Sequence, residues 1–167
     1  DVQSSRINAF DRDDLFVLQT LADQIAIAIE EARLYEETLA RQRLEQELAL
    51  AAEIQSSLLP ESPPLIGGWE VAAFWRPALE MAGDFYDFLA LTEGRWGFVI
   101  ADVSDKGIPA AIFMAVARSS IRASVLGRRP PAEALARANA LLLNDTRADM
   151  FVTLCYCILE PTTGALT

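Results

Sequence analysis

The 167-residue sequence contains no histidine, one lysine and only two cysteines. The lack of histidine excludes a histidine general base, a Ser-His-Asp triad and any zinc site with a histidine ligand. Chemistry in this chain must therefore use carboxylates, hydroxyl groups, arginines and bound ions. The net charge of −10 argues against a nucleic-acid-binding surface, so no nucleic-acid partner is expected.

The two cysteines, Cys155 and Cys157, occupy alternate positions of the apolar run "TLCYCIL". Residues i and i+2 of a strand share one face and rarely meet disulfide geometry, so reduced thiols are expected. No apolar run approaches the ~20 residues that span a bilayer, and the N-terminus "DVQSSRINAF" lacks a signal-peptide pattern. These features predict a cytoplasmic protein without a membrane span.

Two helical segments open the chain. Residues 1–37 include "DRDDLFVLQTLADQIAIAIEEARLYEE", in which aspartates precede apolar residues at helical spacing. Residues 38–60 form a second segment, whose apolar positions alternate steps of four and three as in a coiled coil. That seam comprises Leu44, Leu48, Ala51, Gln55 and Leu58. The alternative is an amphipathic helix that packs on its own domain. The prolines of "PESPP" then end the helix and mark a domain boundary.

Residues 61–167 alternate between strand and helix patterns, which predicts an α+β domain. Residues 69–78 are a strand candidate, and "DFYDFLALTEGRWGFVIADVS" reads as a hairpin that turns at Thr92 to Gly94. Helices are expected over residues 108–126 and 130–146, each opened by a proline. A strand and a turn at "EPTTG" close the sequence, so part of this domain is expected to lie elsewhere.

Acidic residues stand where the two hairpin strands begin and end. Asp84 and Asp87 follow Gly83, while Asp102 follows the buried run "WGFVIA" and Asp105 comes three residues later. Hard divalent cations take carboxylate and carbonyl oxygens, and neighbouring strands would bring Asp84 and Asp102 together. The alternative is that Asp84 caps a turn and Asp102 caps the following helix.

Four motifs in order strengthen the metal interpretation: "AAEIQSSLLP", "GWEVAAFWRPALEMAGDFYDF", "GFVIADVSDKGIPAAIFMA" and "MFVTLCYCILEPTTGAL". Over about residues 51–167 the chain resembles the bacterial SpoIIE-like or RsbU-like serine/threonine phosphatases of the PPM superfamily. The resemblance implies an α+β fold, part of a PPM-type β-sandwich flanked by helices, preceded by a long helical or coiled-coil linker. Residues 61–167 would be the N-terminal portion of the phosphatase domain.

The same resemblance implies two divalent cations, Mn²⁺ or Mg²⁺, that activate a water against a phosphoserine or phosphothreonine. Asp84 would bind one metal, Asp102 would bridge both, and the backbone carbonyl of Val103 would be a further ligand. Asp87 and Asp105 would contribute to an outer shell. Position 105 is commonly glycine in the family, so its aspartate is a departure. No organic cofactor is implied.

Resemblance also assigns the rest of the chain. Residues 1–37 are similar to the C-terminal end of a GAF sensor domain, and residues 38–60 to the linker that joins sensor and phosphatase. A homodimer is expected through the seam of Leu44, Leu48, Ala51 and Leu58. The substrate would be a phosphorylated protein such as an anti-anti-sigma (STAS-type) factor, and the fragment alone would be inactive. The alternative function is a non-catalytic dimerisation scaffold or a degenerate phosphatase.

Overall fold

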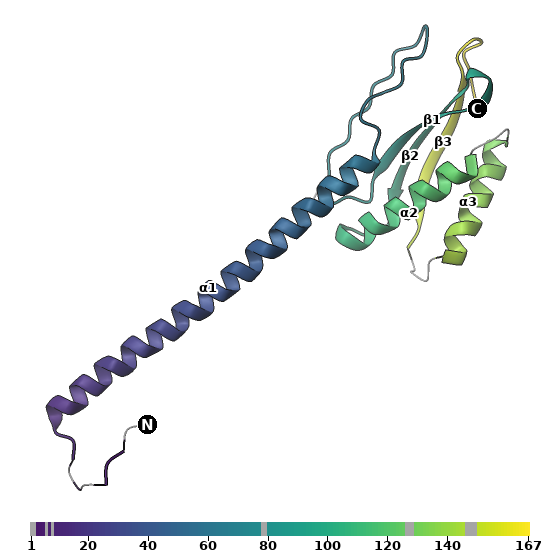
Figure 1. Ribbon diagram of the computed structural model, residues 1–167. Helices are drawn as coiled ribbons and strands as arrows, with labels where there is room; N and C mark the ends of the chain where they lie inside the picture. The colour runs from purple at the N-terminus through teal and green to yellow at the C-terminus, as the bar shows by residue number, and fades with distance from the viewer. Residues whose placement is uncertain (1–2, 6, 8, 78–79, 126–128, 146–149) are drawn as a thin grey trace. The chain divides into compact units, whose positions relative to one another are not determined.

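A computed structural model describes residues 3–5, 7, 9–77, 80–125, 129–145 and 150–167 (Figure 1). The chain divides into two compact units, residues 1–47 and residues 48–167. The boundary falls inside the long helix α1 (Arg12–Leu58). The helix continues without interruption past the expected boundary between residues 37 and 38, so the assignment of those segments to sensor and linker stays a prediction.

The start of α1 is fixed by a capping box. The Oδ1 atom of Asp11 accepts hydrogen bonds from the backbone N–H groups of Asp13 and Asp14, both at 2.9 Å. The Oδ2 atom of Asp14 accepts the Asp11 N–H at 3.1 Å in return. These bonds satisfy N–H groups that have no partner within the helix. The apolar side chains in this part of α1 are exposed, Leu21 and Ile25 by 53% and 58%.

The second unit is built on a four-stranded antiparallel sheet in the order β1-β2-β3-β4. The strands are β1 (Phe85–Ala90), β2 (Trp96–Val103), β3 (Val152–Glu160) and β4 (Ala165–Leu166). The short 3₁₀ helix η1 (Thr92–Gly94) joins β1 to β2, which confirms the predicted hairpin and its turn. The α+β class is confirmed, and the described residues contain one sheet.

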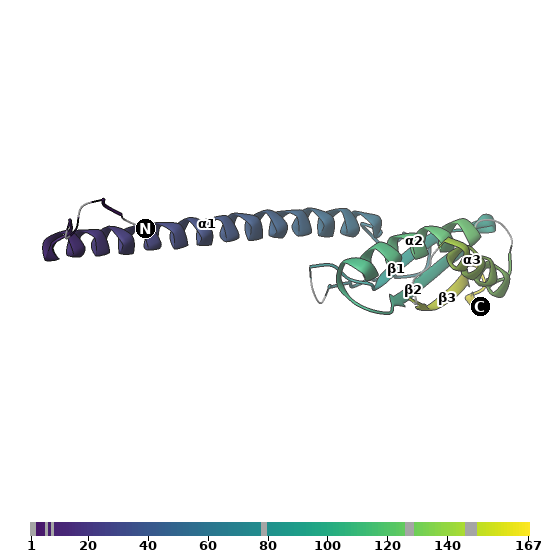
Figure 2. The same ribbon diagram turned by 90° about the horizontal axis from the view of Figure 1, so that it is seen from below.

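Helices α2 (Gly107–Val125) and α3 (Pro131–Asp145) cover one face of the sheet (Figures 1 and 2). Pro109 lies in the first turn of α2, where its missing N–H has no intrahelical partner to lose. The core between helices and sheet is apolar and almost fully buried, and includes Phe85, Val103, Met114 and Ile121. We call the side of the sheet that α2 and α3 cover the helix face, and the opposite side the open face.

Helix α2 is long and apolar enough by length and composition to cross a membrane. Its buried side chains instead pack against the sheet, and its Arg118 forms an ion pair with a buried carboxylate of β1. Such packing is typical of a core helix.

The prediction of a strand over residues 69–78 is wrong for the described part of that segment. Ile66 and Trp69 form an isolated bridge, and residues 70–77 join no sheet. Side chains attach the segment instead: the Trp69 Nε1–H donates to the Pro161 carbonyl at 3.1 Å, and the Trp75 Nε1–H donates to the Asp84 carbonyl at 3.0 Å. Alternating apolar residues suit a strand, but without a neighbouring edge they form no ladder. Ala78 lies outside the described residues.

Candidate metal centre

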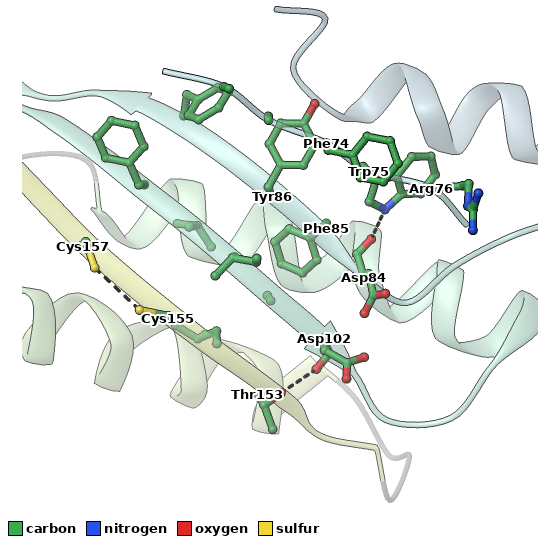
Figure 3. Close-up of a pocket in the computed structure, with 18 residues that line it drawn as sticks. Phe74, Trp75, Arg76, Asp84, Phe85, Tyr86, Asp102, Thr153, Cys155 and Cys157 are labelled. Carbon is green, nitrogen blue, oxygen red and sulfur yellow. Dashed lines mark hydrogen bonds between the residues drawn. The ribbon is translucent and has the colours of Figure 1, made fainter. Parts of the chain in front are cut away.

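Asp84 and Asp102 face each other at one end of the β1–β2 hairpin. The antiparallel register pairs Phe85 with Ala101. The residues that come next at this end of the hairpin, Asp84 before β1 and Asp102 in β2, therefore lie opposite each other. Both side chains lie on the open face (Figure 3). The sequence predicted this convergence, and the register produces it.

The pair is electrostatically unfavourable in the absence of a cation. The pKa of the Asp84 carboxyl is raised above 3.8, first by the partial desolvation of this largely exposed group, then by a hydrogen bond to Asp102 and by the charge of Asp102. Two carboxylates that share a site without a positive partner disfavour each other's ionised form. A divalent cation would relieve that repulsion and take the oxygen ligands it prefers.

The backbone of Gly83, directly before Asp84, approaches the carbonyl of Val103, directly after Asp102. A Cβ placed on Gly83 would lie 3.0 Å from the Val103 carbonyl oxygen, and 3.4 Å from the Cβ of Ala110 in α2. The small residue before Asp84 therefore leaves room around an oxygen that could complete a metal site. Two carboxylates and this carbonyl fit a hard divalent cation. Among the described residues no group of three or more His, Cys, Asp or Glu side chains gathers at one point.

Two side chains that the sequence did not single out hold the backbone around Asp84. The Trp75 indole binds the Asp84 carbonyl, as described above. The Gln55 side chain binds both backbone polar groups of Ala82. Gln55 is the one polar residue of the predicted seam, and that departure from an apolar pattern was the signal that could have identified it.

Asp87 lies on the other face of the sheet from Asp84 and Asp102, so the structure does not favour its expected outer-shell role, which stays a prediction. Alternation along β1 turns its side chain to the helix face, where it is 1% exposed. Its Oδ2 atom lies 3.2 Å from Nε of Arg118, without good hydrogen-bond alignment, and 3.1 Å from Nη1 of Arg122. Burial raises the pKa of Asp87, and the two arginines offset part of that effect. Asp87 therefore joins β1 to α2.

Asp105 lies in the loop between β2 and α2 with a positive φ of 79°. This left-handed conformation favours glycine, and aspartate tolerates it better than most residues. The Oδ1 atom of Asp105 accepts the Lys106 N–H at 2.9 Å. The outer-shell role of Asp105 stays a prediction.

A hollow of about 840 Å³ runs along the open face, with Asp84 and Asp102 at one end (Figure 3). Its floor is largely apolar and includes Phe88, Phe98 and Ile100. Cys155 and Cys157 line it with their Sγ atoms 3.6 Å apart, and both are free thiols, as predicted. The hydrogen bond between the two thiols is the main cause that raises the pKa of Cys157, and burial is the second.

Comparison with known proteins supports the expected family. Residues 92–167, which include β2, α2 and Asp102, match the family model described as Stage II sporulation protein E (SpoIIE). This part of the chain is therefore similar to the SpoIIE family. The resemblance to SpoIIE-like and RsbU-like phosphatases of the PPM superfamily is thereby confirmed.

Three curated relatives extend the match. The chain is 31% identical over 116 residues to the phosphoserine phosphatase RsbU of Bacillus subtilis, which covers 70% of this chain and 34% of RsbU. It is 32% identical over 68 residues to the phosphoserine phosphatase RsbP of the same organism, 40% of this chain and 16% of RsbP. It is 42% identical over 76 residues to protein IcfG of Synechocystis, 46% of this chain and 12% of IcfG. The chain thus spans about a third or less of each relative.

A solved structure supports the PPM-type fold of this chain. The SiaA-PP2C domain of Pseudomonas aeruginosa superposes with a TM-score of 0.52 at 21% identity. The match covers 69% of this chain and 49% of that domain's chain. Similarity at this level concerns the fold alone.

Proposed function

We propose that the protein carrying this chain is a metal-dependent protein serine/threonine phosphatase. The observation that carries the proposal is the pairing of Asp84 with Asp102 at the end of the β1–β2 hairpin, where the backbone of Gly83 also approaches the Val103 carbonyl. The relatives named phosphoserine phosphatases support the same chemistry. The cations would be two Mn²⁺ or Mg²⁺ ions.

Each residue of the site would have a distinct role. Asp84 would bind one cation through its carboxylate, Asp102 would bridge both, and Val103 would add its carbonyl oxygen. When bound, the cations would supply a hydroxide near neutral pH and offset charge on the phosphoryl group. The antiparallel register holds the two carboxylates at the end of a buried strand, which limits their freedom before any ligand binds.

The substrate would be a phosphorylated regulator, following the family resemblance to phosphatases of anti-anti-sigma factors. The described residues supply two converging carboxylates, fewer oxygen ligands than two cations need, so the chain alone would have little or no activity. Residues from the rest of the protein would complete the site.

Regulation would come from the N-terminal part. Residues 1–37 would end a GAF sensor, and residues 38–60 would link it to the phosphatase in a cytoplasmic homodimer. The seam would include Leu44, which is 56% exposed, together with the half-buried Leu48, Ala51 and Leu58. A non-catalytic scaffold is the second candidate, favoured by the large exposed apolar side chains of α1.

The test is Mn²⁺-dependent hydrolysis of a small phosphate ester by the full-length protein. Asp102→Asn should lower kcat by about 100-fold or more, because it removes the group that would bridge the cations. Glu53→Gln, the same carboxylate-to-amide change at an exposed position of α1, is the matched control. Equal activity of Asp102→Asn and the control would reject the assignment, and an inactive wild-type protein would favour the scaffold.

A further inference from the structure

Gln55 is the one residue of α1 that the structure buries, with 3% of its surface exposed. Its Nε2 donates to the Ala82 carbonyl at 2.7 Å, and its Oε1 accepts the Ala82 N–H at 3.0 Å. The opposite orientation of the amide would set donor against donor and acceptor against acceptor, so both bonds fix the side chain in one position. The Gln55 side chain thus satisfies both backbone hydrogen-bonding groups of Ala82, as a paired residue in a neighbouring strand would.

A second link lies on the other side of Asp84. The Tyr86 Oη–H donates to the carbonyl of Pro60, two residues beyond the end of α1, at 3.1 Å. Ala82 and Tyr86 stand two residues before and two residues after Asp84. The end of α1 and the residues that follow it therefore bind the backbone of Ala82 before Asp84 and the side chain of Tyr86 after it.

Little freedom remains between Ala82 and Asp84. Gly83 packs against Val103 and Ala110, and the Asp84 carbonyl is bound by Trp75. A displacement of Ala82 cannot be absorbed by a loose loop and would move the Asp84 carboxylate relative to Asp102. Buried backbone groups that lose their partners also carry a penalty, so Ala82 would follow Gln55 rather than separate from it.

We propose that Gln55 is a positioning residue, which holds Asp84 opposite Asp102 and makes the metal pair respond to the position of α1. The proposal rests on the proposed function and adds a direct route from the helix to a metal ligand. Gln55 does not touch substrate or metal in this route. Groups that orient metal ligands from outside the coordination shell commonly change metal affinity by about 10–100-fold.

The test measures Mn²⁺ affinity by calorimetry on the full-length, substrate-free protein. Gln55→Met keeps an unbranched side chain of similar size but removes both hydrogen bonds. It should weaken Mn²⁺ binding by about 10-fold. Gln55→Glu keeps the acceptor for the Ala82 N–H and loses the donor, so its Mn²⁺ affinity should fall between those of wild type and Gln55→Met. Gln46→Leu changes an exposed glutamine of the same helix and should bind Mn²⁺ as wild type does.

Kinetics separate positioning from general damage. Saturating Mn²⁺ should restore most of the kcat lost in Gln55→Met and leave the KM for the phosphate ester nearly unchanged, whereas a misfolded protein gains nothing from excess metal. If Gln55→Met does not fold, Gln55→Glu decides through its Mn²⁺ affinity. Wild-type Mn²⁺ affinity in both Gln55 variants would overturn this proposal alone. A wild-type protein that binds no Mn²⁺ would overturn the proposed function.

Discussion

The backbone of Gly83 packs so closely on Val103 that a Cβ at position 83 would lie 3.0 Å from the Val103 carbonyl oxygen and 3.1 Å from the Val103 Cβ. Val103 is the last residue of β2 and is 2% exposed. A side chain at position 83 must therefore displace either this buried residue or the backbone that leads into Asp84. The contact makes the proposed metal site sensitive to a single methyl group.

The Gly83→Ala variant should bind Mn²⁺ at least several-fold more weakly and lose about 1–3 kcal/mol of unfolding free energy through overpacking. Gly67→Ala is the matched control, because a Cβ at Gly67 meets nothing within 4 Å. Calorimetric Mn²⁺ titration and denaturant unfolding measure the two effects. Unchanged Mn²⁺ affinity in Gly83→Ala would argue against Val103 as a ligand.

The Asp84–Asp102 pair should lower the unfolding free energy of the metal-free protein, and the size of this effect should depend on pH. The raised pKa of Asp84 means that the folded state holds this proton more tightly than the unfolded chain does. The unfavourable contribution of the Asp84 carboxylate to the unfolding free energy is therefore absent below pH 3.8. It develops as the pH rises through the raised pKa. In EDTA, Asp102→Asn should stabilise the protein at neutral pH, by less than about 1 kcal/mol because Asp84 is exposed.

Denaturant unfolding near neutral pH and again near pH ~4 measures this gain, which should shrink as Asp84 becomes protonated. With added Mn²⁺ the wild type should become more stable than Asp102→Asn, because a cation that binds the folded wild type stabilises it by mass action. Glu53→Gln should show neither effect. A gain of equal size at both pH values would show that the stabilisation does not come from the charge of Asp102.

The ion pairs of Asp87 should be essential for stability without binding metal. Burial raises the pKa of Asp87 and lowers that of Arg118, so desolvation outweighs the attraction between them. Asp87→Ala would leave Arg118 partly buried without its carboxylate and should cost about 3–5 kcal/mol. The double variant Asp87→Leu/Arg118→Met should recover most of that loss. Denaturant unfolding measures both, and Glu37→Gln, in an exposed pair with Arg33, should change little.

Local rules predicted many of the helices and turns in both units. Aspartates before an apolar helix, the turn at residues 92–94 and the prolines that open α2 and α3 all act over a few residues, so the sequence contains the whole signal. The convergence of Asp84 with Asp102 required one further step, the pairing of two strands joined by a short turn. The direction of Asp87 could also have been predicted, since positions 84 and 87 are an odd number of residues apart along an extended segment and so point to opposite faces.

Long-range contacts set the parts that the sequence did not predict. The seam pattern of residues 44–58 is the same whether the helix faces a second copy or its own domain. Only the contact between Gln55 and Ala82, 27 residues apart, shows that position 55 faces its own domain. The positive φ of Asp105 is a local backbone feature that the sequence also did not predict, because this conformation favours glycine.

The seam residues differ in what they contact, and this difference indicates which of them could form the homodimer. Gln55 is occupied within its own unit and Leu58 is half-buried, whereas Leu44 is 56% exposed and belongs to the unit formed by residues 1–47. Leu44→Glu should therefore disrupt a homodimer without disturbing the phosphatase fold, because a charge in an apolar seam between helices is strongly unfavourable. Sedimentation of the full-length protein should show a monomer, with Mn²⁺ affinity within about twofold of wild type. Gln42→Glu adds the same charge on the same helix at an exposed position outside the seam and should leave the dimer intact. A Leu44→Glu protein that remains dimeric would place the contact between copies elsewhere.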